Sequence, residues 1–377
     1  MPHRKIQLKL IASHLLFALI VTSMPSLLAV FRLEFGLGVF QSSVLPMAIT
    51  VPVMIANLFV GFLIAHIGQK AVLLSSLVLE ITGLILVSLA PGFAMVLIGF
   101  SLVGLATGAA FTALTTVYSE LPEKYQDFGL YHAFFGVAGI LSPIIISFWL
   151  EAGLGYRSLF GVYAGLFVLL MAALSTSRSI SNQKFREFAI TDMVKVAGSP
   201  LMLLGVSVFA LYAAVEIGGS TWSVSAGISI FSLSSRTANL LLSAFWLVFT
   251  LMRFGTDAAA RRVGALNLVR GCLLLAVVSL IVWIVGLTPY AFVLLGAALG
   301  PVFPAFQKHM NGLLPRQQRG LFNGLSYLAT GVASTVFIPL MGGIGEQSLA
   351  YAYIPLVVCG VAMVLVVTAI RRHTASS

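Results

Sequence analysis

The sequence predicts an all-α integral membrane protein with about twelve transmembrane helices. Its 377 residues are 59% apolar and only 8% charged, whereas a soluble domain carries about 25% charged residues. The apolar runs continue for about 20 residues, which is the length of helix that crosses a bilayer. Barrel strands would alternate apolar and polar side chains instead. The runs are therefore helices, which satisfy their backbone groups internally.

Short polar or Gly/Pro-containing breaks separate the expected spans. The first run follows His3-Arg4-Lys5 and resembles the start of a signal peptide, but it is too long for one and lacks a small-x-small cleavage site, so we expect a retained helix. The expected spans are 7–31, 41–65, 71–90, 94–118, 129–150, 158–176, 200–220, 234–256, 265–286, 290–312, 321–342 and 348–370.

The distribution of Lys and Arg predicts the topology. If the N-terminus is inside, the outer loops hold only Arg32, Arg157 and Arg236, and the other 18 of 21 basic residues lie on the inner side. This asymmetry is the positive-inside rule, and it predicts that both termini are cytoplasmic in a multi-pass protein of the cytoplasmic (inner) cell membrane. Basic loops that face anionic membrane lipid account for the net charge of +10, so no nucleic-acid partner is expected.

The longest polar stretch, 176–199, divides the chain into two stretches of six expected spans. Residues 1–175 would form an N-terminal six-helix bundle and 200–377 a C-terminal one, joined by a cytoplasmic linker. Many secondary transporters consist of two such repeats, with the solute site near the midplane between them. We expect the monomer to be the functional form.

A resemblance to the major facilitator superfamily begins at Gly61-Phe-Leu-Ile-Ala-His-Ile-Gly-Gln-Lys70. The family signature in this inner loop is G-x-L-a-D-R-x-G-R-K, and Asp257–Gly264 is a weaker second copy. The resemblance implies a gating loop that contains Gly61, Gly68 and Lys70. Ala65 stands where the family has its acidic residue, so the charge latch that the family usually forms is not expected in its usual form.

Other stretches extend the resemblance. Gly136–Pro143 resembles the fifth-helix G-x-x-x-G-P region, and Leu102–Ala110 resembles a fourth-helix motif without its arginine. The family links that arginine to proton movement in exchangers, so its absence argues against a drug/proton antiporter. Gly104, Thr107 and Gly108 also predict close helix packing of the small-xxx-small kind.

Three stretches of the second half are similar to the branch that contains fucose–proton symporters and sodium-dependent glucose transporters. They are Leu211–Trp222, Ser243–Arg253 and Gly300–Pro304. The branch often has Tyr-x-x-x-Glu followed by Trp in the seventh helix and Trp…Gly-Arg in the eighth. The resemblance implies a sugar-like solute.

Glu216 is the leading candidate for the functional site. A charged side chain at the centre of a membrane helix costs about 2.5–3.5 kcal/mol on insertion scales, so it is retained where it has a role. Tyr212 lies one turn earlier on the same face. Glu216 would bind a proton, a sodium ion or a solute hydroxyl; alternatively, it is a neutral acid that hydrogen-bonds a neighbouring helix.

Polar side chains recur at helical spacing on three later spans. Asn239, Ser243, Trp246, Thr250 and Arg253 follow one face of span eight. In span ten, Gly300, Pro304, Gln307 and Asn311 repeat the pattern, and Pro304 frees a backbone carbonyl there. Span eleven adds Asn323, Tyr327, Thr330 and Ser334, for which hydrogen-bonded helix packing is an equal alternative. The expected solute contacts or coupling residues are Tyr212, Asn239, Trp246, Arg253, Gln307, Asn323 and Tyr327.

The first half offers fewer titratable groups inside its spans. His14 is a coupling candidate because imidazole titrates near neutral pH, although a packing role is the alternative. His132 and Glu80 are interpreted as structural, with Glu80 packed against a hydroxyl of a neighbouring helix. Cys272 and Cys359 lie within apolar runs and are expected to pack as small apolar side chains rather than to form a disulfide or a metal site.

These observations predict a secondary active transporter of a small, neutral, sugar-like solute that works by alternating access. The coupling ion would be a proton or sodium, and no other cofactor or metal is expected. Two alternatives are an exporter of drugs or amphipathic metabolites and a non-transporting membrane receptor or scaffold. The sequence contains no His-Glu-x-x-His, no Gly-x-Ser-x-Gly and no paired intramembrane aspartates, so an enzyme is not expected.

Overall fold

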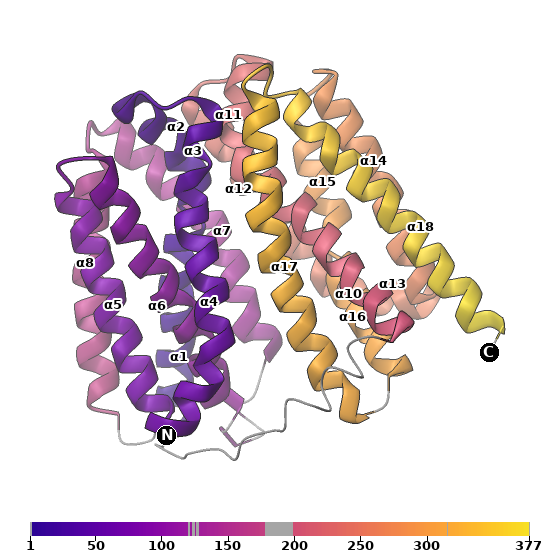
Figure 1. The fold of residues 1–377 in the computed structure, drawn as a ribbon, viewed down its shortest axis with the longest axis horizontal. Coiled ribbons are helices and arrows are strands. Elements are labelled where there is room, and N and C mark those ends of the chain that lie inside the picture. The colour runs from indigo at the N-terminus through magenta and orange to yellow at the C-terminus, as the bar shows by residue number, and fades with distance from the viewer. Residues whose placement is uncertain are drawn as a thin grey trace. The chain divides into compact units, whose positions relative to one another are not determined.

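Among the residues that the structure describes, twelve helical stretches are long and apolar enough to cross a membrane (Figure 1). The computed structural model describes residues 2–119, 121–122, 125, 128–177, 199–314 and 316–376. Within these ranges the secondary structure is helical and contains no strand. The prediction of an all-α membrane protein with about twelve spans is therefore confirmed. Most of the predicted linker, residues 178–198, lies outside the described residues.

The chain separates into two compact units. The first comprises Met1–Leu37 and Val44–Phe188, and the second comprises Gly38–Ser43 and Ala189–Ser377. The helices of the first unit are α1 (Pro2–Val21), α2 (Met24–Phe35), α4 (Val44–Ile67), α5 (Gln69–Leu89), α6 (Phe93–Ser119), α7 (Phe128–Glu151) and α8 (Tyr156–Ser175).

The second unit contains the short helix α3 (Val39–Ser42) and the helices that follow residue 199. These are α10 (Pro200–Ala213), η2 (Ala214–Gly218), α11 (Gly219–Phe231), α12 (Ser235–Phe254), α13 (Thr256–Val263), α14 (Ala265–Ile284), α15 (Ala291–Leu299), α16 (Val302–Leu313), α17 (Arg316–Gly345), η3 (Tyr351–Tyr353) and α18 (Ile354–Ser376).

Glycines let helices of the first unit approach closely. A Cβ at Gly104 of α6 would overlap the carbonyl oxygen of Ile49 in α4, and one at Gly108 would lie 2.7 Å from the carbonyl oxygen of Val53. On α5, a Cβ at Gly83 would lie 2.7 Å from the carbonyl oxygen of Gly99 in α6. The predicted close packing at Gly104 and Gly108 is confirmed, and α6 packs by the same means against α5.

The two inner loops that resemble the family signature, 61–70 and 257–264, make turns of similar backbone geometry. Gly68, between α4 and α5, has φ 84° and ψ 154°, and Gly264, between α13 and α14, has φ 84° and ψ 139°. Side chains disfavour positive φ, so glycine suits both turns. The weak sequence copy at Asp257–Gly264 thus forms the same turn as its counterpart.

Two lysines bind the C-terminal end of α8. Lys9 Nζ donates to the carbonyl of Ala173 at 2.5 Å and to Ser177 Oγ at 2.8 Å. Lys70 Nζ donates to the carbonyls of Ser175 and Ser177 at 3.2 and 3.1 Å. The last carbonyls of a helix lack intrahelical partners and carry partial negative charge, so ammonium groups stabilise them.

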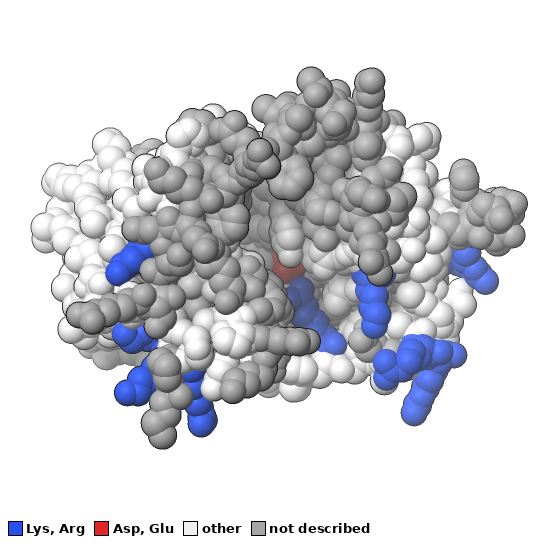
Figure 2. All heavy atoms as spheres, turned by 90° about the horizontal axis from the view of Figure 1, so that it is seen from below, with Lys and Arg blue, Asp and Glu red and all other residues white. Residues whose placement is uncertain are grey.

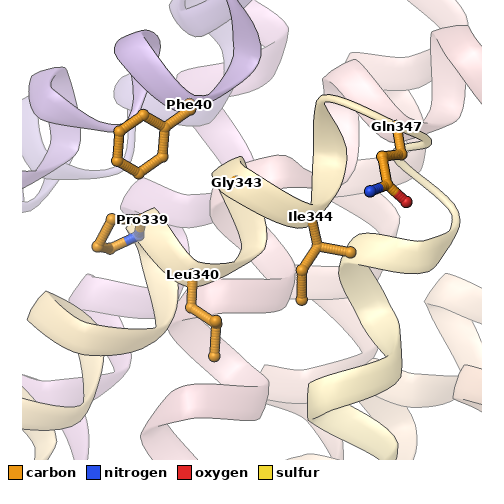
Figure 3. Close-up of a pocket in the computed structure, with 6 residues that line it drawn as sticks. All are labelled: Phe40, Pro339, Leu340, Gly343, Ile344 and Gln347. Atoms are coloured by element: carbon orange, nitrogen blue, oxygen red, sulfur yellow. The ribbon is translucent and has the colours of Figure 1, made fainter.

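Segment Gly38–Ser43 packs on α17, although the sequence predicted that residues 1–175 form one bundle. The backbone N–H of Phe40 donates to Glu346 Oε1 at 2.7 Å, and a Cβ on Gly342 would lie 3.2 Å from Ser43 Cβ. Beside this contact lies a pocket of about 400 Å³, lined by Phe40, Pro339, Leu340, Gly343, Ile344 and Gln347 (Figure 3).

Span seven is longer than predicted. It was expected to end at residue 220, but it continues through α11 to Phe231 and includes the π-helical turn η2. The small polar residues after Gly219 lie mostly beyond the predicted end of the span, but they belong to the helix. The hydroxyls of Thr221 and Ser223 donate to carbonyls of their own helix, at Ile217 over 2.6 Å and at Ser220 over 2.8 Å. Such back-bonding satisfies hydroxyls inside a helix.

Candidate functional site

Glu216 lies in the π-helical turn of span seven, within the second unit. A π-turn inserts one residue into a helix, and such turns are frequent at functional sites. The surroundings of Glu216 along the span are buried: Tyr212, before the turn, and Val215, within it, are each 1% exposed, whereas Glu216 itself is half-buried. The turn thus sets a partly accessible carboxylate in a buried stretch of the span.

Arg253 of α12 supplies the positive charge of this site. Its guanidinium attracts the Glu216 carboxylate and also acts on the hydroxyl of Tyr212. It lies 4.3 Å above the ring of Phe249, a cation–π contact that holds it beside its own helix. We name Tyr212, Glu216 and Arg253 the charged cluster.

Helix α17 adds Tyr327 and helix α16 adds Gln307. The Gln307 amide interacts with the Tyr327 hydroxyl, and the charge of Arg253 reaches the same hydroxyl. Tyr327 is 54% exposed, and its ring lies 6.0 Å from that of Phe303. The structure therefore brings five predicted site residues together: Tyr212, Glu216, Arg253, Gln307 and Tyr327.

Span ten has a short break beside the charged cluster. Helix α15 ends at Leu299 and α16 begins at Val302, with Gly300 and Pro301 between them in right-handed helical backbone angles. Pro304, which the sequence predicts to free a backbone carbonyl, lies in the first turn of α16, where the helix itself does not need the missing N–H. The hydroxyl of Tyr212 donates to the carbonyl of Leu299 at 3.4 Å.

Two residues of the site were not predicted from the sequence. One is Leu299, whose carbonyl accepts from Tyr212; in the sequence, only the Gly300-Pro301 pair that follows indicates a free carbonyl there. The other is Phe303, whose ring lies 4.6 Å from Phe209 and 5.7 Å from Tyr212. Phe303 falls inside the Gly300–Pro304 stretch, but an aromatic residue among 27 phenylalanines carries no signal without the fold.

Other predicted site residues have their contacts elsewhere. Asn239 is fully buried, and its amide donates to the carbonyl of Ser235 in its own helix at 2.9 Å. Trp246 is 7% exposed and packs edge-on against Phe245 and Phe249. The backbone of Asn323 belongs to α17, and its side chain lies outside the described residues.

In the first unit, His14 lies in an aromatic cluster. It is 4% exposed, and its ring centroid lies 4.2 Å from Tyr131, 4.8 Å from Phe111 and 6.3 Å from Phe135. Its environment is that of a packed side chain, and its coupling role stays a prediction.

The other polar residues singled out in the first unit have different surroundings. Glu80 is fully buried beside Thr107 of α6, and among the described residues neither of its carboxyl oxygens has a hydrogen-bond partner, so its packing role stays a prediction. The side chain of His132 lies outside the described residues. Of the predicted gating loop, Gly61 falls within α4, Gly68 forms the turn and Lys70 binds the end of α8.

In the part of the chain that the structure describes, twelve helices are apolar and long enough to cross a membrane, and one unit has a charged cluster inside its spans, an arrangement typical of multi-pass membrane transporters. A model of the Major Facilitator Superfamily matches residues 10–292. The chain belongs to this superfamily.

Individual relatives are more distant. A facilitated trehalose transporter of Apis mellifera ligustica is 29% identical over 115 residues, which cover 30% of this chain and 22% of that protein. The crystal structure of the nucleoside transporter NupG has a TM-score of 0.78 at 14% identity and covers 97% of this chain and 98% of its own.

Two sugar symporters have similar structures. A D-xylose-proton symporter has a TM-score of 0.78 at 15% identity, covering 96% of both chains. The E. coli fucose:proton symporter has a TM-score of 0.66 at 15% identity, covering 98% of this chain and 99% of its own. At these identities the likeness establishes the fold, and the resemblance of the second half to the fucose branch remains one of sequence.

Proposed function

We propose that the protein is a secondary active transporter that moves a small, neutral, sugar-like solute by alternating access, coupled to protons or sodium. The charged cluster carries the proposal. A carboxylate and a guanidinium inside membrane spans are costly, and such groups mark solute or ion pathways. We propose Glu216 as the group that binds the coupling ion. The ionised carboxylate of Glu216 would compensate the positive charge of Arg253, and this compensation would end when Glu216 is neutralised.

Accessibility favours a subset of the predicted residues for solute contact. Tyr327 is exposed, and Gln307, Arg253 and Glu216 are half-buried. An amide, a phenol and a charged pair hydrogen-bond solute hydroxyls, while the Phe303 and Tyr327 rings offer apolar faces. Asn239, Trp246 and Tyr212 are buried, so we propose that they support the site rather than touch the solute. Relatives named for trehalose, fucose and xylose transport favour a sugar.

We also propose that the molecule lies with its N-terminus in the cytoplasm of a cell membrane and acts as a monomer. Figure 2 shows the molecule from below, at the end where the N-terminus lies in Figure 1. Lys and Arg side chains lie at several places on the described surface in this view. Arg4 and Lys5 begin α1, and Arg261 and Arg262 end α13. Basic side chains favour the cytoplasmic face.

Replacing Glu216 by glutamine tests the proposed function. In proteoliposomes, we expect gradient-driven accumulation of the transported sugar to fall about tenfold or more, because each 1.4 kcal/mol of lost coupling energy is a factor of ten. Trehalose, fucose and xylose are offered under a proton gradient and then under a sodium gradient. Exchange of labelled for unlabelled sugar without a gradient should persist, since glutamine keeps the hydrogen-bonding shape.

Glu151→Gln is the matched control, because Glu151 is an exposed acid at the end of α7. It should transport like the wild type. Normal accumulation by Glu216→Gln would refute the coupling role. Efflux of amphipathic dyes with no sugar flux would support an exporter instead, and specific sugar binding without any flux would support a receptor.

A further inference from the structure

The hydroxyl of Tyr212 has one hydrogen-bond acceptor in the structure and a carboxylate nearby that can compete with it. It donates to the carbonyl of Leu299 at 3.4 Å, while Glu216 lies one turn further along the same span, where the charge of its carboxylate acts on the hydroxyl. A phenol has a single O–H to donate, so it serves one acceptor at a time. The contact at 3.4 Å is long for an O–H···O bond, whose usual length is about 2.7–2.8 Å. The bond to Leu299 is therefore easily exchanged.

The ionisation state of Glu216 decides which acceptor is preferred. A hydrogen bond to an ionised carboxylate is about twice as strong as one between neutral groups. An ionised Glu216 thus draws the Tyr212 hydroxyl towards itself. A protonated Glu216 loses this advantage, and the hydroxyl remains with Leu299.

Leu299 is the last residue of α15, directly before the break at Gly300-Pro301. Gly300 packs on the backbone of Phe249: a Cβ there would overlap the carbonyl oxygen of that residue. Phe249 in turn holds the guanidinium of Arg253 over its ring. The break therefore touches the charged cluster twice, through Tyr212 and through the Phe249–Arg253 turn of α12.

The groups around Glu216 come from several elements. Segment η2 packs against α10, α11, α17 and α18. The described titratable or charged side chains of these helices are Tyr212 on α10, Tyr327 on α17, and Cys359 and Arg371 on α18, while α11 has none. Arg253 from α12 completes the set. Of these, Tyr212 and Arg253 act on the carboxylate directly.

We propose that Tyr212 is a positioning residue that links the ionisation of Glu216 to the break in span ten. When Glu216 ionises, the Tyr212 hydroxyl turns from Leu299 to the carboxylate and releases the end of α15. When Glu216 is protonated, the hydroxyl returns to Leu299. The O–H rotates and no covalent bond changes. The inference rests on the proposed coupling role of Glu216.

Tyr212→Phe removes the hydroxyl and keeps the ring. We expect uptake in proteoliposomes to lose most of its dependence on the gradient, while exchange without a gradient persists. The pH midpoint of uptake should move by about one unit to the alkaline side, because the ionised carboxylate loses a charge-assisted bond worth more than the neutral bond to Leu299.

Tyr353→Phe is the matched control. Tyr353 is also fully buried and donates to a backbone carbonyl, that of Gly219 next to η2, at 2.8 Å. Both variants lose one buried phenol–carbonyl bond, so a purely structural role predicts the same small loss of stability and an unchanged pH profile in both. A changed profile in Tyr212→Phe alone supports the switch.

A wild-type pH profile and gradient dependence in Tyr212→Phe would overturn the inference. The result for Glu216→Gln separates this failure from that of the proposed function. If Glu216→Gln is uncoupled and Tyr212→Phe is normal, the switch is wrong and the coupling role stands. If Glu216→Gln couples normally, the proposed function itself fails.

Discussion

Replacing Arg253 by glutamine is expected to abolish gradient-driven uptake and to lower the free energy of unfolding by about 2 kcal/mol. Arg253→Gln leaves the Glu216 carboxylate without the compensating charge of Arg253, a loss that costs about 3–5 kcal/mol where two fully buried charges are in direct contact. Glu216 and Arg253 are only half-buried, so solvent screening reduces this cost. The shift in melting temperature of the purified protein in detergent measures the stability, and vesicle uptake measures the activity.

The double variant Arg253→Gln with Glu216→Gln isolates the interaction. It should recover much of the lost stability, since neither charge remains to be compensated, although gradient coupling stays absent. Arg236→Gln, at the exposed start of the same helix, is the matched control and should be near neutral. A double variant no more stable than Arg253→Gln would show that the two side chains do not depend on each other.

Gly104→Ala is expected to destabilise the first unit by about 2 kcal/mol, although alanine is normally the better helix former. The new methyl group would overlap the Ile49 carbonyl oxygen, and helix α6 would have to move away from α4. Overpacking of this kind costs about 1–3 kcal/mol. The fraction of folded protein after heating, followed by size-exclusion chromatography, gives the change.

Gly165→Ala makes the same chemical change at a helix position of the same unit where a Cβ meets nothing within 4 Å. There the gain in helix propensity should stabilise by up to about 1 kcal/mol. Opposite signs for the two variants are the expected result. Equal changes in stability would mean that the close approach of α4 and α6 does not exclude a methyl group at residue 104.

Much of the fold follows from the sequence because hydrophobic runs of membrane length have one structural solution. The runs predicted the number and order of the spans, and the Lys and Arg pattern predicted a topology that remains to be measured. Gly68 and Gly264 were recognisable because a helix-to-helix turn at positive φ favours glycine.

The errors arose where local sequence is ambiguous. Small polar residues after Gly219 are compatible with a loop or with a buried helix, and only the packing around span seven decides. Proline marks a break without fixing its position: α15 ends at Leu299, two residues before Pro301, while Pro304 lies in the first turn of α16. The π-turn at Ala214–Gly218 has no sequence signature of its own.

The charged residues of the candidate site could be predicted from the sequence. Glu216 and Arg253 stand out because charge is rare inside the spans, and helical spacing indicated Gln307 and Tyr327. The spacing did not show that Asn239 is buried and bonds its own helix, or that Trp246 is buried among aromatic side chains. Nor did it show that Tyr212 reaches the carbonyl of Leu299, because contacts between distant spans depend on tertiary packing.

The docking of Gly38–Ser43 on α17 has a consequence for how the molecule is made. Phe40 and Glu346, which this contact joins, are 306 residues apart. During synthesis the contact of Gly38–Ser43 with α17 cannot form until nearly the whole chain has been made, because α17 is the last membrane span but one. The second unit therefore cannot be completed from its own stretch of polypeptide. A fragment beginning at residue 200 would lack a piece of its own surface, because residues 38–43 of the second unit come from the beginning of the chain.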